Sequence, residues 1–332
     1  MRELLENKSI LVTGGAGSIG SALVKKIMEY KPKIIRALDI NETGLFNLKH
    51  KLGTESVRLL VGDIRDRERL KRAVEDIDII FHAAAMKHVS LCEFNPFDAI
   101  QTNVLGTKNL IEAALDEEVD RFITISTDKA VNPVNVLGAS KLLAERLTVS
   151  ANLYKGRRKT VFSCVRFGNV LNSQGSVLPL FRDQIRKGGP VTITDEGMTR
   201  FVMSIDKATE LVLKAAKVSK GGEIFILKME ALRIKDLAHA AIAEIAPLHK
   251  HDPAGIRTEL IGKKHGEKLY EELLNEYEAE NAHEDEDMFI LSPNGKNVPR
   301  QNVEKLYESR NTRLMAVEEI RKMLRSLKED SF

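Results

Sequence analysis

The stretch ILVTGGAGSIG, residues 10–20, decides the fold of this chain. Its apolar and β-branched beginning, residues 10–13, predicts a buried strand, and residues 18–30 place apolar side chains at helical spacing. The glycines between them follow a G-x-x-G-x-x-G pattern, which permits a tight turn and lets backbone N–H groups approach a pyrophosphate. We therefore predict a dinucleotide site, with a purely structural glycine turn as the alternative. Its predicted contributors are Gly14, Gly17, Ser18, Ile19 and Gly20.

The same alternation of strand and helix continues through the first half of the chain. Short runs rich in apolar and β-branched residues occur at 34–38, 57–61, 77–82, 122–126 and 161–167. Helical patterns lie between them, notably at 66–74 and 96–116. Nearly continuous apolar strands separated by helices are typical of a parallel sheet that is covered on both faces. The sequence therefore predicts an α/β fold with a Rossmann-type, doubly wound parallel sheet.

The pattern loosens after residue 168. Further strands are expected at 191–194, 222–227 and 258–261, and a helix at 234–245. We predict a dinucleotide-binding domain over 1–168, with a return segment at about 201–228. Residues 169–200 and 229–332 then form a smaller, interwoven α/β substrate-binding cap. The acidic run at 276–287 is interpreted as a solvated linker or helix face.

Composition restricts the class of protein. The 332 residues carry 51 Lys and Arg against 48 Asp and Glu, and a net charge of +3 does not indicate nucleic acid or an anionic membrane as a general partner. The apolar runs are too short for a membrane span, and the N-terminus resembles no secretory signal. Two cysteines form no disulfide framework, and the histidines show no ligand spacing apart from His249 and His251. We expect a soluble cytoplasmic protein without a metal site.

The ends of the second and third strands predict the adenosine contacts. Asp39 lies nineteen positions after Gly20, where a carboxylate can accept hydrogen bonds from a ribose diol and would repel a 2′-phosphate. This favours NAD, while nearby Arg36 and Lys49 keep NADP possible. Asp63 and Ile64 are expected beside the adenine, although Asp63 could instead cap the following helix.

Several further motifs make the chain recognisable. They are TGGAGSIG at 13–20, HAAA at 82–85 with AAAMKHV at 83–89, STDKA at 126–130, FGNVL at 167–171, MTRF at 198–201 and GEK at 266–268, together with Lys141. From about residue 8 to about 275 the chain resembles the UDP-N-acetylglucosamine 4,6-dehydratases, a branch of the extended short-chain dehydrogenase/reductases. It is similar to their short form, which lacks an N-terminal membrane region.

The chain departs from this family pattern at three places. Leu137 stands where the superfamily has the tyrosine of Y-x-x-x-K, while Lys141 is retained. Ser90 replaces the usual proline after K-H-V, and Lys264 and His265 replace Arg-Pro before G-E-K. The missing tyrosine leaves open which group takes the proton of the 4-hydroxyl.

The resemblance implies roles for a short catalytic stretch. Dehydration requires hydride loss at C4, removal of the C5 proton, and protonation of the departing 6-hydroxyl. We assign Asp128 as the acid at O6 and Lys129 as the base at C5, which requires a lowered pKa at Lys129. Thr127 is expected to contact the 4-hydroxyl, with Lys141 completing the proton relay. As an alternative, Thr127 and Asp128 only cap a turn and Lys129 is solvated.

Other residues are expected to bind the two ligands. Ala83, Ala84, Lys87, Thr102 and Lys141 are assigned to the cofactor. Lys87, Asn169, Arg200, Lys264 and Glu267 are assigned to the UDP-sugar. Lys87 could also be a surface lysine, and Arg200 an interdomain ion-pair partner.

The sequence leaves several functions open. The first is conversion of UDP-N-acetylglucosamine to a UDP-2-acetamido-2,6-dideoxy-4-keto-hexose. Alternatives are release of a 5,6-ene sugar, a UDP-sugar 4-epimerase or plain dehydrogenase, and a non-catalytic NAD-binding regulator. Relatives commonly pair through the helices at 96–116 and 137–149, so a homo-oligomer is expected.

Overall fold

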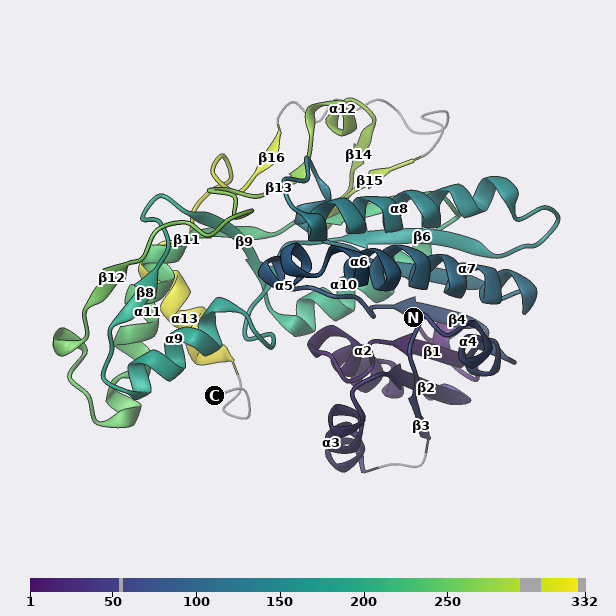
Figure 1. Cartoon of the computed structure of the whole chain (residues 1–332), viewed down its shortest axis with the longest axis horizontal. Coiled ribbons are helices and arrows are strands. Elements are labelled where there is room, and N and C mark those ends of the chain that lie inside the picture. Colours follow the sequence, from purple (N-terminus) through teal and green to yellow (C-terminus); the bar gives the residue numbers. More distant parts are fainter. Residues whose placement is uncertain (54–55, 293–305, 328–332) are drawn as a thin grey trace.

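The computed structural model describes residues 1–53, 56–292 and 306–327, and its core is a twisted sheet of nine strands (Figure 1). The strand order is β14-β15-β10-β6-β5-β4-β1-β2-β3, with parallel pairing from β3 through β10. The order 3-2-1-4-5-6 is that of a dinucleotide-binding sheet, which confirms the predicted fold. The parallel strands are β1 (Ser9–Thr13), β2 (Ile34–Asp39), β3 (Val57–Val61), β4 (Ile79–His82), β5 (Arg121–Ile125), β6 (Val161–Arg166) and β10 (Ile224–Leu227).

Helices cover both faces of this sheet because successive side chains of a strand point in opposite directions. Ile10 and Val12 belong to the apolar cluster that includes α2 (Ser18–Met28) and α10 (Ile205–Val218). Leu11 belongs to the cluster formed with α4 (Arg67–Val74) and α7 (Thr107–Asp116). The long helix α8 (Val136–Tyr154) packs beside α7. One further helix, α3 (Glu42–Leu52), follows β2.

Predicted element boundaries hold to within a few residues, with one exception. The helix expected at 96–116 consists of α6 (Pro96–Ala99), a π-helical segment Ile100–Gly106, and α7. A short helix, α5 (Val89–Phe94), precedes it. The π-helical turn carries Thr102 and Asn103, so it sets the orientation of two side chains near the site.

The cap, which lies at the left of Figure 1, has its own apolar core. It contains α9 (Val177–Arg186), α11 (Ile234–Ile245) and α13 (Val317–Ser326), the parallel pair β8 (Val191–Ile193) and β12 (Thr258–Leu260), and the strands β7 (Asn169–Val170), β9 (Thr199–Met203) and β11 (Glu230–Arg233). The chain leaves the large sheet after β6 and returns to it through α10 and β10. The cap is therefore interwoven with the sheet.

The structure differs from the predicted cap boundaries near the end of the chain. Strands β15 (Met288–Leu291) and β14 (Ala282–Glu284) extend the large sheet, although the sequence assigned them to the cap: β15 pairs antiparallel with β10, and β14 pairs antiparallel with β15. The pair β13 (Glu272–Leu274) and β16 (Tyr307–Glu308), with α12 (Glu276–Ala279), bridges the two regions. Positions 293–305 and 328–332 of the predicted cap lie outside the described residues. Among the described residues, no helix is long and apolar enough to cross a membrane.

Candidate active site

The glycine turn forms a close-fitting cradle between β1 and α2. A Cβ atom on Gly14, whose φ is +69°, would lie 2.7 Å from the backbone of Ala83, and one on Gly20 would lie 2.0 Å from the Gly14 carbonyl oxygen. No side chain fits at either position. The cradle therefore suits the backbone approach to a pyrophosphate for which glycine is needed.

Asp39 at the end of β2 is bonded to the same turn. One carboxylate oxygen accepts the Ala16 N–H at 3.0 Å, and the other accepts the Asn41 N–H at 2.9 Å. Each oxygen keeps a lone pair for another donor. Asp39 therefore stabilises the glycine turn and faces the cavity beside it.

Asp63 lies in the same cavity, paired with Arg65. Its carboxylate accepts the Arg65 Nε–H and backbone N–H, both at 2.8 Å. Burial alone would raise the pKa of Asp63, but these bonds to Arg65 lower it overall. The helix that follows is capped by Asp66, not by Asp63, so the capping alternative for Asp63 does not apply.

A single cavity of about 820 Å³ runs from the glycine turn to the ends of β5 and β6. Its size is within the range typical of ligand pockets. All thirteen residues predicted for the cofactor line it: Gly14, Gly17, Ser18, Ile19, Gly20, Asp39, Asp63, Ile64, Ala83, Ala84, Lys87, Thr102 and Lys141. Thr127, Lys129 and Asn169 line its far part. The cavity thus joins the predicted cofactor and substrate groups.

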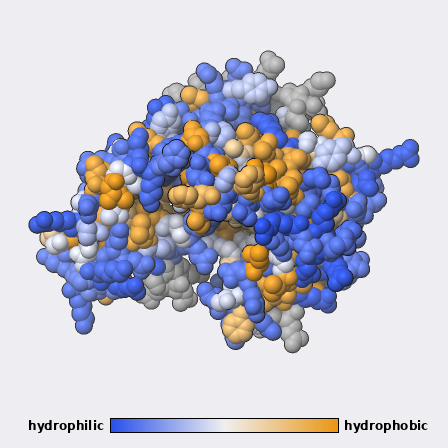
Figure 2. All heavy atoms as spheres, in the orientation of Figure 1, coloured by the Kyte–Doolittle hydropathy of each residue, from blue (hydrophilic) through white to orange (hydrophobic). Residues whose placement is uncertain are grey.

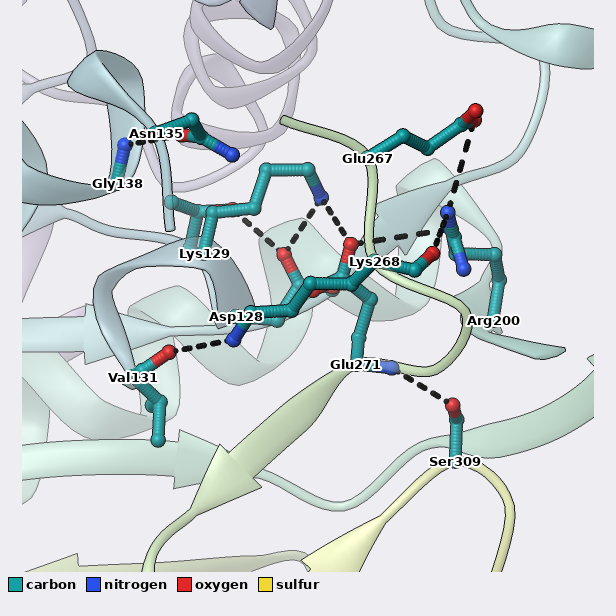
Figure 3. Close-up of polar contacts among 12 residues, drawn as sticks. Asp128, Lys129, Val131, Asn135, Gly138, Arg200, Glu267, Lys268, Glu271 and Ser309 are labelled. Atoms are coloured by element: carbon teal, nitrogen blue, oxygen red, sulfur yellow. Dashed lines mark hydrogen bonds and ion pairs between the residues drawn. The ribbon is translucent and has the colours of Figure 1, made fainter. Parts of the chain in front are cut away.

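The predicted catalytic stretch lies where β5 ends, the edge at which ligands bind in such sheets. Thr127 Oγ1 donates to Asp128 Oδ1 at 2.8 Å, and Lys129 Nζ donates to the same oxygen at 2.9 Å (Figure 3). Asp128 is fully buried, and its Oδ2 has no hydrogen-bond partner. Lys129 reaches the cavity wall, while Asp128 lies behind it. The carboxyl is thus connected to the cavity through Thr127 and Lys129.

A second carboxylate contacts Lys129. Glu271 directly precedes β13 and is only 2% exposed. Its Oε1 lies 3.3 Å from Lys129 Nζ. Burial alone would lower the pKa of Lys129, but the charges of Asp128 and Glu271 outweigh it and raise the pKa. The lowered pKa expected for Lys129 is therefore wrong. The sequence could not show this carboxylate, because Glu271 lies 142 positions further along the chain.

Lys141 on α8 has the lowered pKa instead, because burial outweighs the charge of Glu145. Its Nζ donates to the Ile125 carbonyl at 2.6 Å. Leu137, one helical turn earlier, lines the cavity and packs with Cys92 and Ala99. The position of the missing tyrosine is therefore an apolar wall that neither donates nor accepts a proton.

Lys87 lies after β4, where burial lowers its pKa. Its Nζ donates to the Gln174 carbonyl, and the Gln174 N–H donates to Ser18 Oγ at 2.9 Å. Residues 173–176 line the cavity and so connect the cap to the glycine turn. Lys87 is therefore an exposed side chain whose ammonium is bonded at this junction.

Two polar side chains near the cavity had no assigned role. Asn103 holds the backbone of Met86 through both an accepted and a donated hydrogen bond, of 2.8 and 3.1 Å. Ser126 lines the cavity with an unpartnered, buried Oγ. Asn169, which was predicted, likewise has an unpartnered Oδ1. The serine could have been suspected from its position beside Thr127.

The remaining substrate candidates lie apart from the cavity lining. Arg200 donates to the backbone carbonyls of Thr199, Leu269 and Lys268, with Nη2 3.8 Å from Glu267 Oε1. These contacts fit the ion-pair alternative for Arg200. Lys264 is exposed, and its backbone N–H donates to Glu267 at 3.1 Å.

Comparison with known proteins agrees with this geometry. The model of the family described as "Polysaccharide biosynthesis protein" matches residues 10–293. An uncharacterized membrane protein of Methanocaldococcus jannaschii is 60% identical over 97% of this chain and 96% of its own. An inverting UDP-N-acetylglucosamine 4,6-dehydratase of Campylobacter jejuni is 40% identical over 90% of this chain and 87% of its own.

A relative with a different activity and one solved structure complete the comparison. A UDP-glucose 4-epimerase of Rickettsia bellii is 37% identical over 97% of this chain and 96% of its own. The X-ray structure of Pen from Bacillus thuringiensis is 41% identical, with a TM-score of 0.92 over 98% of this chain and 99% of that one. The chain therefore belongs to the polysaccharide biosynthesis protein family and is an enzyme of the nucleotide-sugar dehydratase and epimerase group of extended short-chain dehydrogenase/reductases.

Proposed function

We propose that this protein is an NAD-dependent UDP-N-acetylglucosamine 4,6-dehydratase. The observation that carries the proposal is the continuous cavity, in which the glycine cradle leads directly to Thr127, Lys129 and Lys141. A pure 4-epimerase needs only the chemistry at C4. The buried Asp128 and the partly exposed Lys129 supply the acid and base that an elimination across C5 and C6 requires.

The cofactor fits the cradle described above. Gly14, Gly17 and Gly20 would hold its pyrophosphate and Asp39 its adenosine ribose, and the ribose contact favours NAD over NADP. When bound, NAD accepts a hydride from C4 of the sugar and supplies it again to C6. Lys141, whose pKa is lowered by burial, faces the same cavity.

The hydrogen bond between Thr127 and Asp128 offers a route for the proton of the 4-hydroxyl. Thr127 Oγ1 receives this proton while passing its own to Asp128 Oδ1, 2.8 Å away. Asp128 then carries the proton that Thr127 gave up, and Thr127 keeps the proton that came from O4. The route needs no tyrosine, which accounts for an apolar Leu137 at that position.

Elimination then uses the two neighbouring side chains. Lys129 takes the proton from C5, which the 4-keto group has made acidic. Asp128 gives its proton to O6 as the C6–O6 bond breaks and water leaves. Once C6 is reduced, Lys129 returns a proton to C5. In this scheme the proton lost from O4 is balanced by the proton that Asp128 gives to the departing water.

Proton NMR of the purified protein with UDP-N-acetylglucosamine in heavy water tests this function. We expect a 6-deoxy-4-keto product that carries deuterium at C5, and NAD as the nucleotide released on denaturation. The spectrum also reports the configuration at C5. This is of interest because the Campylobacter relative is named an inverting enzyme. A galacto-configured product that keeps its 6-hydroxyl would establish the epimerase activity named for the Rickettsia relative instead. A 5,6-ene product or no reaction would likewise overturn the proposal.

We also propose that two copies pair through the helices beside the cavity. Exposed apolar side chains gather on α5, α6, the π-helical segment and α8, and Figure 2 shows this hydrophobic surface in the middle of the face. Phe94 and Phe97 are 85% and 82% exposed. Such a patch is typical of an interface between subunits. Light scattering of the purified protein should give at least twice the mass of 37.2 kDa.

A further inference from the structure

The proposed mechanism leaves one requirement unmet. Lys129 must be an uncharged amine before it can take a proton from C5, yet its contacts with Asp128 and Glu271 favour the ammonium. Asp128 cannot relieve this, because it is already protonated by Thr127 when the C5 proton is to be removed. Another group must accept the proton of Lys129.

Glu271 is in the position to do so. Its Oε1 lies 3.3 Å from Lys129 Nζ and 3.8 Å from Arg200 Nε (Figure 3). Its Oε2 is buried and has no hydrogen-bond partner. Its backbone N–H donates to Ser309 Oγ at 3.0 Å, and its carbonyl accepts the Ser309 N–H at 2.9 Å, so the residue is held in place from β16.

We propose that Glu271 reversibly accepts the proton of Lys129, so that Lys129 becomes a base without losing that proton to water. This inference rests on the proposed function. Glu271 does not line the cavity and acts on the sugar only through Lys129, so it is a positioning residue for the proton.

The proton transfers close into a cycle. Asp128 and Glu271 begin as carboxylates and Lys129 as an ammonium. Asp128 receives a proton from Thr127, which takes up the O4 proton, and Glu271 Oε1 takes a proton from Lys129 Nζ. Lys129 then removes the C5 proton while Asp128 protonates O6, and water leaves. After Lys129 has returned a proton to C5, it takes its own proton back from Glu271, and all three groups regain their first state.

The charges around Glu271 are compatible with this role. Asp128 and Lys129 face it from the end of β5, Arg200 from β9, and Lys268 from the loop before β13. From β16 comes Glu308, whose carboxylate is bonded to Arg310 and Asn311. Burial outweighs the neighbouring cations and raises the pKa of Glu271, so its protonated form is accessible.

The variant Glu271→Gln keeps the shape of the side chain but cannot take up the proton. At pH 7 we expect product formation and deuterium entry at C5 to fall about 10²-fold, the lower end for loss of a proton-transfer group. Reduced nicotinamide should still appear on mixing, because oxidation at C4 does not involve Glu271. Glu271→Asp, which keeps the carboxyl on a shorter stem, should recover part of the rate.

The pH profile separates this role from a packing defect. In Glu271→Gln the proton of Lys129 must leave to water, so elimination should rise about tenfold per pH unit, while the wild type stays nearly level. The matched control is Glu272→Gln, which neutralises the next residue outside the cluster and should behave as the wild type. A wild-type rate in Glu271→Gln, or a loss that higher pH does not relieve, would overturn the inference.

A measurement without substrate tests the contact even where the proposed function fails. The Nζ titration of Lys129 can be followed by NMR of the labelled protein, with Lys129→Met to assign the signal. Removal of the Glu271 carboxylate should lower the pKa of Lys129 by about 1–3 units, the usual effect of an opposite charge at this range. An unchanged titration would show that the two groups are not coupled, whichever sugar the enzyme uses.

Discussion

Arg166→Met should destabilise the protein strongly, because it leaves two buried carboxylates without their cation. Arg166 on β6 is fully buried and makes four charge-assisted hydrogen bonds of 2.7–2.9 Å, two with Glu145 and two with Glu278. A fifth bond, of 3.0 Å, goes to the Leu273 carbonyl. Both carboxylates are at most 7% exposed. Water therefore cannot replace the guanidinium.

The size of the effect follows from this burial. Breaking a buried ion pair by removing one partner costs about 3–5 kcal/mol. The unfolding entropy of a chain of this length is about 0.7 kcal/mol per degree, so Tm should fall by about 4–7 °C. Differential scanning calorimetry measures this fall in Tm.

A triple variant provides the control. Replacing Arg166 by Met together with Glu145→Gln and Glu278→Gln removes all three charges, and it should be more stable than Arg166→Met alone. The reasoning is refuted if Arg166→Met melts with the wild type, or if the triple variant is no more stable than the single one.

Three further outcomes are expected. Lys129→Met should slow elimination by about 10²–10⁴-fold while the cofactor is still reduced. Stopped-flow absorbance would show this as an accumulation of reduced nicotinamide. If the variant never reduces the cofactor, Lys129 acts in the C4 step instead. If Lys264 contacts the diphosphate of the bound substrate, as its sequence position predicts, Lys264→Ala should raise KM more than it lowers kcat, because such a contact is made equally in the ground and transition states. A fall in kcat at constant KM would contradict this prediction. Glu244→Gln should lower the free energy of unfolding by about 1 kcal/mol, since Glu244 joins Arg321 and Arg325 of α13 and the half-exposed Arg325 is screened by solvent. These arginines lower the pKa of Glu244 to about 2. The contribution of Glu244 to the free energy of unfolding should therefore be present above about pH 4.5 and disappear as the pH falls toward 2. Equal urea midpoints of variant and wild type at pH 7 would contradict this prediction.

The parallel sheet could be predicted from sequence because each strand carries its own local signal. Buried apolar runs such as β1 and β5 are bounded by glycine or polar residues, and the glycine turn fixes where the first crossover starts. The two strands β14 and β15 carry a weaker signal. They join the large sheet only because β15 pairs with β10, about sixty positions earlier, and β14 pairs with β15; sequence spacing does not reveal the pairing with β10.

In the site, too, the features with a local sequence signal could be predicted, and those that depend on distant residues could not. Thr127, Asp128 and Lys129 follow a strand whose carboxyl end must face the cavity, so their location could be inferred. The protonation state of Lys129 could not, because it depends on Glu271. The acidic run at 276–287 was interpreted as solvated, yet Glu278 within it is buried against Arg166. An acidic run in a sequence does not reveal whether one of its carboxylates is buried against a cation from a distant part of the chain.

The bonds of Asp39 have a consequence for changing the cofactor preference of this enzyme. The same carboxylate that would repel a 2′-phosphate also ties Ala16 in the glycine turn to Asn41 at the start of α3. A single replacement by a neutral or basic residue would therefore admit the phosphate and loosen the turn together. Conversion to NADP is expected to require a second substitution that restores an acceptor for the Ala16 N–H. The cofactor selectivity of Asp39 and the geometry of the glycine turn therefore cannot be changed independently of each other.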